Sequence, residues 1–251
     1  MDFLQNNRSA SHSHSLDILW TLAQFHDFME SIDSVIDVGC GDGHDALWWA
    51  TATDMDEDNP RPLNINVTAL DKENSIDSNY ELPKNLTFKQ GDLYTTEFEN
   101  RFDVVWSHNI LHSTNDPLKF LHKMNEFCTD GGMLGLSFPA TSNMFYGDPD
   151  YRVYREAPHG ITMIHLIYML VLSGFNCREG YFTKQPGTNI ISAIVYKDTD
   201  EVFGHGEKPL SEYSELLPVS CQQQLNKYNY LTNKGLLLDW INGATLDYSS
   251  F

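Results

Sequence analysis

The chain has 251 residues, a formal net charge of −19 at pH 7 and an isoelectric point near 4.7. This length is sufficient for one α/β domain with a sizeable hydrophobic core and additional segments. The excess of acidic side chains would repel a phosphate backbone, so a nucleic-acid substrate is disfavoured, and an acidic surface that keeps the protein in solution is the simpler explanation.

The cysteines and the apolar stretches argue against an exported or membrane-bound protein. The four cysteines form no C-x-x-C pair, so neither a zinc site nor a disulfide framework is expected. The first residues lack a basic start followed by an apolar core, which argues against a secretory signal. The longest apolar stretch, residues 161–175, is shorter than the roughly 20 residues of a membrane span. We therefore expect a cytoplasmic protein with no membrane segment and no bound metal.

Three regions follow one another along the chain. Residues 1–33 are expected to form a flexible segment and then a capping helix, because apolar side chains recur at helical spacing from Leu16 to Met29. This helix is either plain packing or a lid over a ligand. Residues 34–197 form the predicted main domain. Residues 198–251 form a C-terminal extension, expected to be a strap on the core, with a dimerisation element or a lid as alternatives.

The main domain opens on the stretch Ser34-Val-Ile-Asp-Val-Gly-Cys-Gly-Asp-Gly-His44. A β-branched run ends in a loop with glycine at every second position, and an apolar run follows, which predicts a strand, a tight loop and a helix. Glycines leave no Cβ in the way, so a ligand can lie against the backbone of the loop. The helix that follows directs free N–H groups at that ligand.

The rest of the main domain alternates strands and helices. Strands are predicted at 66–71, 86–90, 102–107 and 133–138, helices at 117–128 and 161–173, and a final pair of strands at 175–182 and 189–196. Residues 54–62 are charged and contain prolines, which predicts a surface insertion. The pattern predicts an α/β fold of the Rossmann-like type, with helices on both faces of an open, seven-stranded and mainly parallel sheet.

The glycine loop resembles the first motif of class I S-adenosylmethionine-dependent methyltransferases, an acidic residue followed by x-Gly-x-Gly-x-Gly. Here the motif reads Asp37-Val-Gly-Cys-Gly-Asp-Gly43. A dinucleotide fingerprint would place its third glycine at position 44, where His44 stands. The resemblance covers about residues 34–196. It implies a last strand that is antiparallel, S-adenosylmethionine as the cofactor and S-adenosylhomocysteine as its product.

Three acids, Asp37, Asp71 and Asp92, stand at the ends of successive predicted strands, where open parallel sheets bind ligands. One carboxylate can accept hydrogen bonds from two vicinal ribose hydroxyls, which is the role expected of Asp71. The resemblance implies that Asp92 accepts from the adenine amino group, that the N–H of Leu93 meets a ring nitrogen, and that Asp37 and the loop backbone hold the methionine amino end. The expected cofactor residues are Asp37, Gly39, Cys40, Gly41, Gly43, Asp71, Lys72, Gly91, Asp92, Leu93 and Ser107.

The stretch Ser107-His-Asn-Ile-Leu-His112 resembles the fourth motif of the same family, which faces the methionine part and the transferred methyl group. Methyl transfer is an in-line displacement that depends mainly on positioning, and it requires a base only if the acceptor arrives protonated. His108 and His112 are the candidate catalytic residues, with His112 the preferred base. A capping or purely structural histidine is the alternative for each.

The long connection after the fifth strand, residues 139–160, is where the resemblance places the acceptor pocket. Its candidate substrate-binding residues offer aromatic walls with polar tips, suited to a small or planar acceptor. They are Tyr146, Tyr151, Tyr154 and His159. A loop that merely covers the sheet would contain similar residues.

We therefore predict a methyltransferase that acts at oxygen or nitrogen of a small-molecule acceptor. Other hypotheses are the transfer of a different group from the sulfonium, as in aminopropyltransferases, and an NAD-dependent oxidoreductase. A non-catalytic S-adenosylmethionine-binding partner protein is a further alternative, as is a methyltransferase acting on a basic protein. The sequence leaves the acceptor, its reacting atom and the oligomeric state open.

Overall fold

The computed structural model describes residues 31–53, 61–74, 82–139, 161–184, 190–207, 212–219 and 221–223. Its strands are β1 (Ser34–Val38), β2 (Asn66–Asp71), β3 (Leu86–Gln90), β4 (Phe102–His108), β5 (Cys128–Pro139), β6 (Phe175–Lys184) and β7 (Ile190–Lys197). Its helices are α4 (His44–Ala50), α5 (Pro117–Phe127) and α7 (Met163–Leu172), with 3₁₀ turns η1 (Leu111–Ser113) and η3 (Ser214–Leu216). The predicted helix at 16–29 lies outside the described residues.

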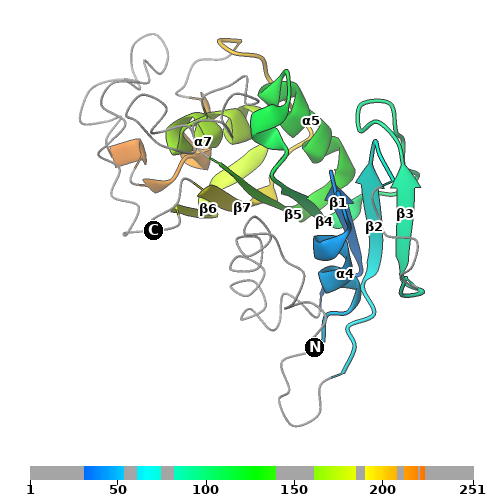
Figure 1. Cartoon of the computed structure of the whole chain (residues 1–251). Helices are drawn as coiled ribbons and strands as arrows, with labels where there is room; N and C mark the ends of the chain where they lie inside the picture. Colours follow the sequence, from blue (N-terminus) through cyan, green and yellow to red (C-terminus); the bar gives the residue numbers. More distant parts are fainter. Residues whose placement is uncertain are drawn as a thin grey trace, which may run out of the picture.

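The seven strands form one sheet in the order β3-β2-β1-β4-β5-β7-β6, drawn in Figure 1. Neighbours among β1 to β5 pair in parallel, and β7 runs antiparallel to both β5 and β6. The predicted α/β fold, the mainly parallel sheet and the antiparallel last strand are therefore confirmed. The strand order reverses between β1 and β4. Open α/β sheets bind ligands at the carboxyl ends of the strands at such a point, and we call this edge of the sheet the crevice.

Apolar side chains cover both faces of the sheet. Ile36 and Val38 belong to a buried cluster with the inner faces of α5 and α7, whereas Val35 belongs to a second cluster with α4 (Figure 1). This alternation follows from the two-residue period of a strand. Within the described residues, no helix has the length and apolar character needed to cross a membrane.

The largest difference from the predicted boundaries is the start of β5. The sequence predicts a helix to Cys128, a turn at Gly131 and Gly132, and a strand from Met133. In the structure α5 ends at Phe127 and the strand begins at Cys128, with Gly131 accommodated inside it at φ 72°. A register shift in the pairing with β4 between Phe102 and Val104 absorbs the irregular backbone.

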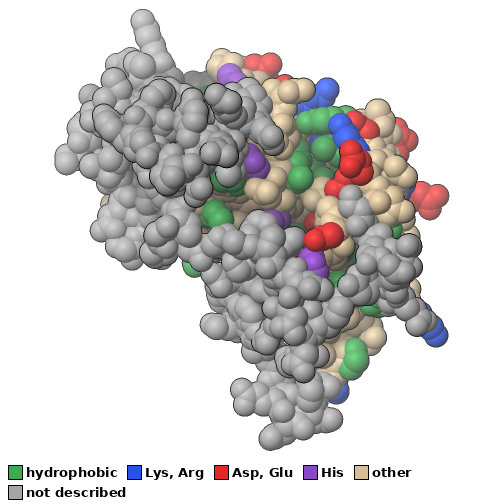
Figure 2. Space-filling model, viewed as in Figure 1, with side chains coloured by type: hydrophobic (Ala, Val, Ile, Leu, Met, Phe, Trp, Pro, Cys, Tyr) green, Lys and Arg blue, Asp and Glu red, His purple; other side chains and the backbone are tan. Residues whose placement is uncertain are grey.

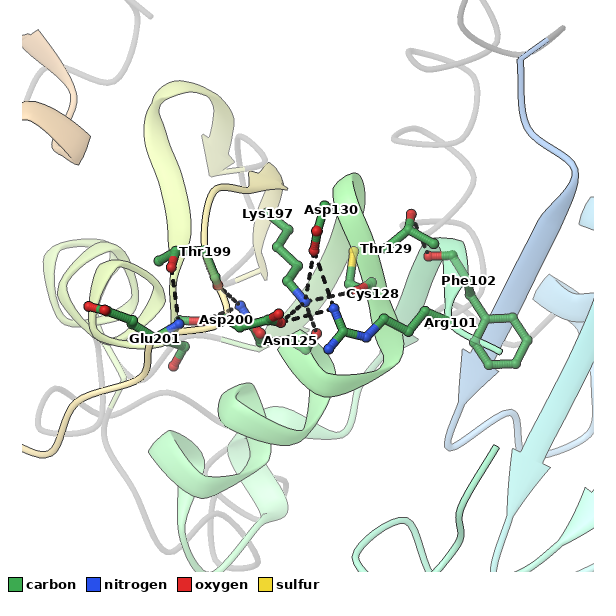
Figure 3. Close-up of polar contacts among 11 residues, drawn as sticks. Arg101, Phe102, Asn125, Cys128, Thr129, Asp130, Lys197, Thr199, Asp200 and Glu201 are labelled. Carbon is green, nitrogen blue, oxygen red and sulfur yellow. Dashed lines mark hydrogen bonds and ion pairs between the residues drawn. The ribbon is translucent and has the colours of Figure 1, made fainter. Parts of the chain in front are cut away.

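The chain after β7 packs on the α5 and α7 side. The N–H of Phe203 donates to the Leu172 carbonyl at the end of α7 over 2.8 Å, and Tyr213 and Leu217 are buried in the same apolar cluster. At the amino-terminal edge of β5, the buried Lys197 ammonium donates to the carbonyls of Asn125 and Cys128, each at 3.0 Å, and to the Asp200 carboxylate at 2.6 Å (Figure 3). The described part of the predicted extension therefore packs on the core.

Candidate active site

The glycine loop lies at the crevice. Gly39 has φ 75° and Gly41 φ 52°, and the N–H groups of Gly39 and Cys40 donate to the Leu70 carbonyl at the end of β2 over 2.8 and 3.2 Å. A Cβ at Gly39 would lie 2.4 Å from the Ile110 side chain, whereas a Cβ at Gly41 would meet no atom of the described residues within 4 Å. The loop is therefore packed at Gly39 against the segment that follows β4 and is open at Gly41, where a ligand can approach its backbone.

Asp71 ends β2 directly opposite this opening. Its Oδ2 accepts a hydrogen bond of 2.9 Å from the Gly41 N–H, and its Oδ1 accepts one of 3.1 Å from Glu73 N. The carboxylate thus faces the glycine loop. Each oxygen has a second lone pair, so both can accept further hydrogen bonds from a ligand.

Asp37 is a buried carboxyl group below the loop, with 2% of its surface exposed. Its Oδ2 has no hydrogen-bond partner in the part of the chain that the structure describes. Burial, followed by the nearby charge of Asp45, raises its pKa well above the ordinary value, although the N–H of Ala46 hydrogen-bonds to it and works in the opposite direction. An unpaired buried carboxylate oxygen suits a cationic amino group. The same burial raises the pKa of the Cys40 thiol.

The ends of β2 and β3 are held together by polar contacts. The Gly91 N–H donates to the Asp71 carbonyl over 2.8 Å, and Lys72 Nζ lies 2.9 Å from Asp92 Oδ2. Asp92 Oδ1 also accepts from Tyr94 N over 2.8 Å. The hydrogen bond from Lys72, and then that from Tyr94, lower the pKa of the Asp92 carboxyl, which favours the ionised form. Leu93 is partly buried beside the α5 cluster.

β4 adds Ser107 and His108 at the same edge, and η1 adds His112. The Ser107 hydroxyl donates to the Val38 carbonyl over 2.8 Å and so joins the ends of β4 and β1. After β4 the chain turns at Asn109, with φ 61°, and His112 in η1 is buried. Its Nδ1 has no hydrogen-bond partner among the described residues. Burial, followed by the charge of His108, lowers the pKa of His112 to about 4.

A comparison with known protein families finds a match that includes the strands and the loop of this site. Residues 30–159, more than half of the chain, match a family described as "Methyltransferase domain". The chain belongs to this methyltransferase domain family. The predicted relationship to S-adenosylmethionine-dependent methyltransferases is therefore confirmed, and with it S-adenosylmethionine as the cofactor of the family.

Solved methyltransferases share the fold at low sequence identity. The S-adenosylmethionine-dependent methyltransferase SibL, in its apo form, is 18% identical over 75% of this chain and 57% of its own, with a TM-score of 0.53. Human N-acetylserotonin methyltransferase in complex with SAM is 17% identical over 74% of this chain and 55% of its own, with a TM-score of 0.52. An S-adenosylmethionine-dependent methyltransferase from Mesorhizobium loti is 14% identical over 65% of this chain and 90% of its own, with a TM-score of 0.51. The chain spans little more than half the length of the first two proteins.

In this methyltransferase domain the expected cofactor residues gather at one sheet edge, around the loop between β1 and α4. Figure 2 shows acidic and histidine side chains close to one another on one face of the molecule. The expected acceptor residues Tyr146, Tyr151, Tyr154 and His159 lie outside the described residues. The described ranges contain no cluster of three or more His, Cys, Asp or Glu side chains arranged to hold a metal ion.

Two neighbours of the site were not expected from the sequence. Ile110 fills the space beside Gly39 that a Cβ would occupy. The Trp106 indole N–H donates to Asp45 Oδ2 over 2.9 Å, which places a second buried acid beside Asp37. An acid in the first turn of α4 and a tryptophan inside an apolar strand are the sequence signals that could have suggested this pair.

Proposed function

We propose that this chain transfers the methyl group of S-adenosylmethionine to an oxygen or nitrogen atom of a small-molecule acceptor. The observation that carries the proposal is the Asp71 carboxylate, hydrogen-bonded to the Gly41 N–H at the point where the loop is open. A sugar resting on that backbone would have its vicinal hydroxyls beside both carboxylate oxygens. Membership of the methyltransferase domain family supports the same assignment.

Each part of the cofactor has proposed partners in this chain. The unpaired Asp37 oxygen and the backbone of Gly39–Gly41 hold the methionine amino end, because a buried carboxyl group gains most from a nearby positive charge. Asp71 binds the ribose, and Asp92 with the N–H of Leu93 binds the adenine. The remaining proposed cofactor residues, which shape the crevice around these contacts, are Cys40, Gly43, Lys72, Gly91 and Ser107.

When bound, S-adenosylmethionine supplies an electrophilic methyl carbon, whose bond to sulfur breaks as the bond to the acceptor forms and leaves the electron pair on sulfur. The chain's own residues position the reactants and handle the acceptor proton. His108 and His112 are the proposed catalytic residues. Burial keeps the His112 imidazole neutral at pH 7, so a ring nitrogen is available to accept a hydrogen bond from the acceptor.

The acceptor and the outer segments complete the proposal. Tyr146, Tyr151, Tyr154 and His159 are proposed to line the acceptor pocket, since they are aromatic side chains with polar tips. We divide the chain into an N-terminal segment with a capping helix (1–33), the methyltransferase core (34–197) and a C-terminal extension (198–251). The burial of Tyr213 and Leu217 against the core supports a strap for the described part of that extension.

Binding and turnover are tested separately. Isothermal titration with S-adenosylmethionine and S-adenosylhomocysteine should give one site per chain, and Asp71→Ala should weaken both. Incubation with a methyl-labelled donor and a cell extract, split into small molecules and proteins, should then label a small molecule by the mass of one methyl group. Binding without any labelled product supports a non-catalytic partner protein instead, and a labelled protein fraction supports a protein acceptor.

A further inference from the structure

A row of polar side chains crosses the sheet from the end of β4 over β5 and β7 to β6. His108 on β4 is paired with Ser137 on β5, Ser137 with Ser192 on β7, and Ser192 with Thr183 on β6. Paired residues on neighbouring strands point to the same face of a sheet. The imidazole and the three hydroxyls therefore share one face, and we call these four residues the hydroxyl row.

The hydroxyl row starts beside the glycine loop. Two residues before His108 and Ser137, the same face carries Trp106 on β4 and Gly135 on β5. Asp37 on β1 is paired with Trp106. The Trp106 ring lies against Gly135, where a Cβ would approach it to 2.4 Å. Ile194 on β7 is paired with Gly135, and we call Trp106, Gly135 and Ile194 the apolar level. A molecule lying on the hydroxyl row would thus rest beyond the apolar level, next to the turn at Gly39.

The centre of the row is a pair of buried serines. The Ser137 and Ser192 hydroxyl oxygens are 3.1 Å apart, and both residues are buried at 1% and 4% exposure. Only one of the two hydroxyl hydrogens can lie between the oxygens. The hydrogen bonds of the described residues provide no acceptor for the other. Because a buried polar group is costly without a partner, the pair retains a donor and several lone pairs for one.

We infer that the hydroxyl row binds the acceptor of the proposed methyl transfer, and that the acceptor group lying on it is an uncharged hydroxyl, carbonyl or amide. This inference rests on the proposed function. The row contains no carboxylate, ammonium or guanidinium group. A charged acceptor group would lose its hydration there without a counter-charge from the row, whereas hydroxyls both donate to and accept from a neutral polar group.

The test uses the full-length protein, methyl-labelled S-adenosylmethionine and a small-molecule cell extract separated by ion exchange into anionic, cationic and neutral fractions. The wild-type protein should label a compound of the neutral fraction. With that compound purified, Ser137→Ala and Ser192→Ala should each raise its KM about tenfold, as expected for one lost hydrogen bond in a buried site. Their affinity for S-adenosylhomocysteine, measured by titration, should stay within twofold of wild type.

Two further variants separate binding from folding. The double variant Ser137→Ala with Ser192→Ala leaves no hydroxyl unpaired, so it should fold even if a single variant does not. Ser173→Ala is the matched control, because this serine is equally buried but donates to the Met169 carbonyl within α7. It should leave the KM of the acceptor unchanged.

The outcomes separate a failure of this inference from a failure of the proposed function. A wild-type KM in the double variant, with or without a lower melting temperature, means that the serines only tie β5 to β7 and overturns the inference alone. Label confined to the anionic or cationic fraction also overturns it and leaves the proposed function intact. If the wild-type protein binds the cofactor but labels nothing, the proposed function fails, and this inference fails with it.

Discussion

The backbone N–H of Gly41 donates to the side chain of Asp71 over 2.9 Å, although the two residues are 30 positions apart in the sequence. The bond closes the gap between the loop after β1 and the end of β2. It also holds the carboxylate in the orientation that the proposed contact with a pair of ribose hydroxyls would need. The contact that joins these two segments is therefore also the one on which the proposed ribose site depends.

Replacing Asp71 should weaken cofactor binding more than it weakens the fold. Hydrogen bonds to a charged group are worth about 1.5–3 kcal/mol, so Asp71→Ala should raise the Kd for S-adenosylhomocysteine about 10- to 100-fold in isothermal titration. Asp71→Asn keeps one acceptor oxygen and should lose less. Glu99→Gln removes an exposed acid elsewhere and is the control. Wild-type affinity in Asp71→Ala would contradict the proposed ribose contact.

Gly39 and Gly206 form a matched pair for a test of the loop. Both have a left-handed backbone, with φ 75° and 78°. A Cβ at Gly39 would clash with Ile110, whereas one at Gly206 would meet no atom within 4 Å in the part of the chain that the structure describes. Gly206→Ala should cost about 1 kcal/mol of unfolding free energy from backbone strain alone. Gly39→Ala should cost about 2–4 kcal/mol, because overpacking is added. Equal losses in urea unfolding would show that Ile110 moves aside.

His112 should make the protein less stable as the pH falls. Its pKa is about 4 in the folded chain and 6.5 ordinarily, so between these values the unfolded chain takes up a proton that the folded chain refuses. This contribution to stability is complete above pH 6.5 and declines toward pH 4, by about 3 kcal/mol in all. Urea unfolding of wild type and His112→Gln at pH 7.5 and 5 should show the smaller loss in the variant. Identical losses of unfolding free energy in the two proteins would mean that other titratable groups cause the pH dependence.

Lys197 should be among the most important charges for stability. Its side chain has no exposed surface and its ammonium donates to two carbonyls and to Asp200 (Figure 3). Lys197→Met removes the donor to the Asn125 and Cys128 carbonyls inside the protein, so it should lower the unfolding free energy by about 2–4 kcal/mol. The exposed Lys84 provides the comparison, since Lys84→Met should change the unfolding free energy by at most about 0.5 kcal/mol. Thermal unfolding of the two variants checks this, and similar melting temperatures would refute it.

The elements around the cofactor crevice could be predicted because their signals are local. A β-branched run, alternate glycines and an acid after the next strand together require only short-range rules, and Asp71 does lie against the glycine loop. The start of β5 was missed because a glycine pair indicates a turn, whereas the pairing with β4 holds this segment in the sheet from Cys128 onward.

The chemistry of the histidines could not be read in the same way. The spacing of His108 and His112 places both after β4, but the loss of hydration that lowers the pKa of His112 depends on how the chain packs around η1. Likewise, no local pattern predicts that Ile110 lies beside Gly39. The serines of the hydroxyl row are visible as polar interruptions of two apolar strands, yet only the strand order makes them neighbours.

The hydrogen bond from Ser107 to the Val38 carbonyl spans the one place in the sheet where the winding direction changes. A displacement of the glycine loop stretches this bond, and so does a displacement of the segment that carries the histidines. The two halves of the crevice are thereby mechanically coupled. If the glycine loop binds the methyl donor as proposed, a shift of that loop would reach the segment of His108 and His112 through this bond.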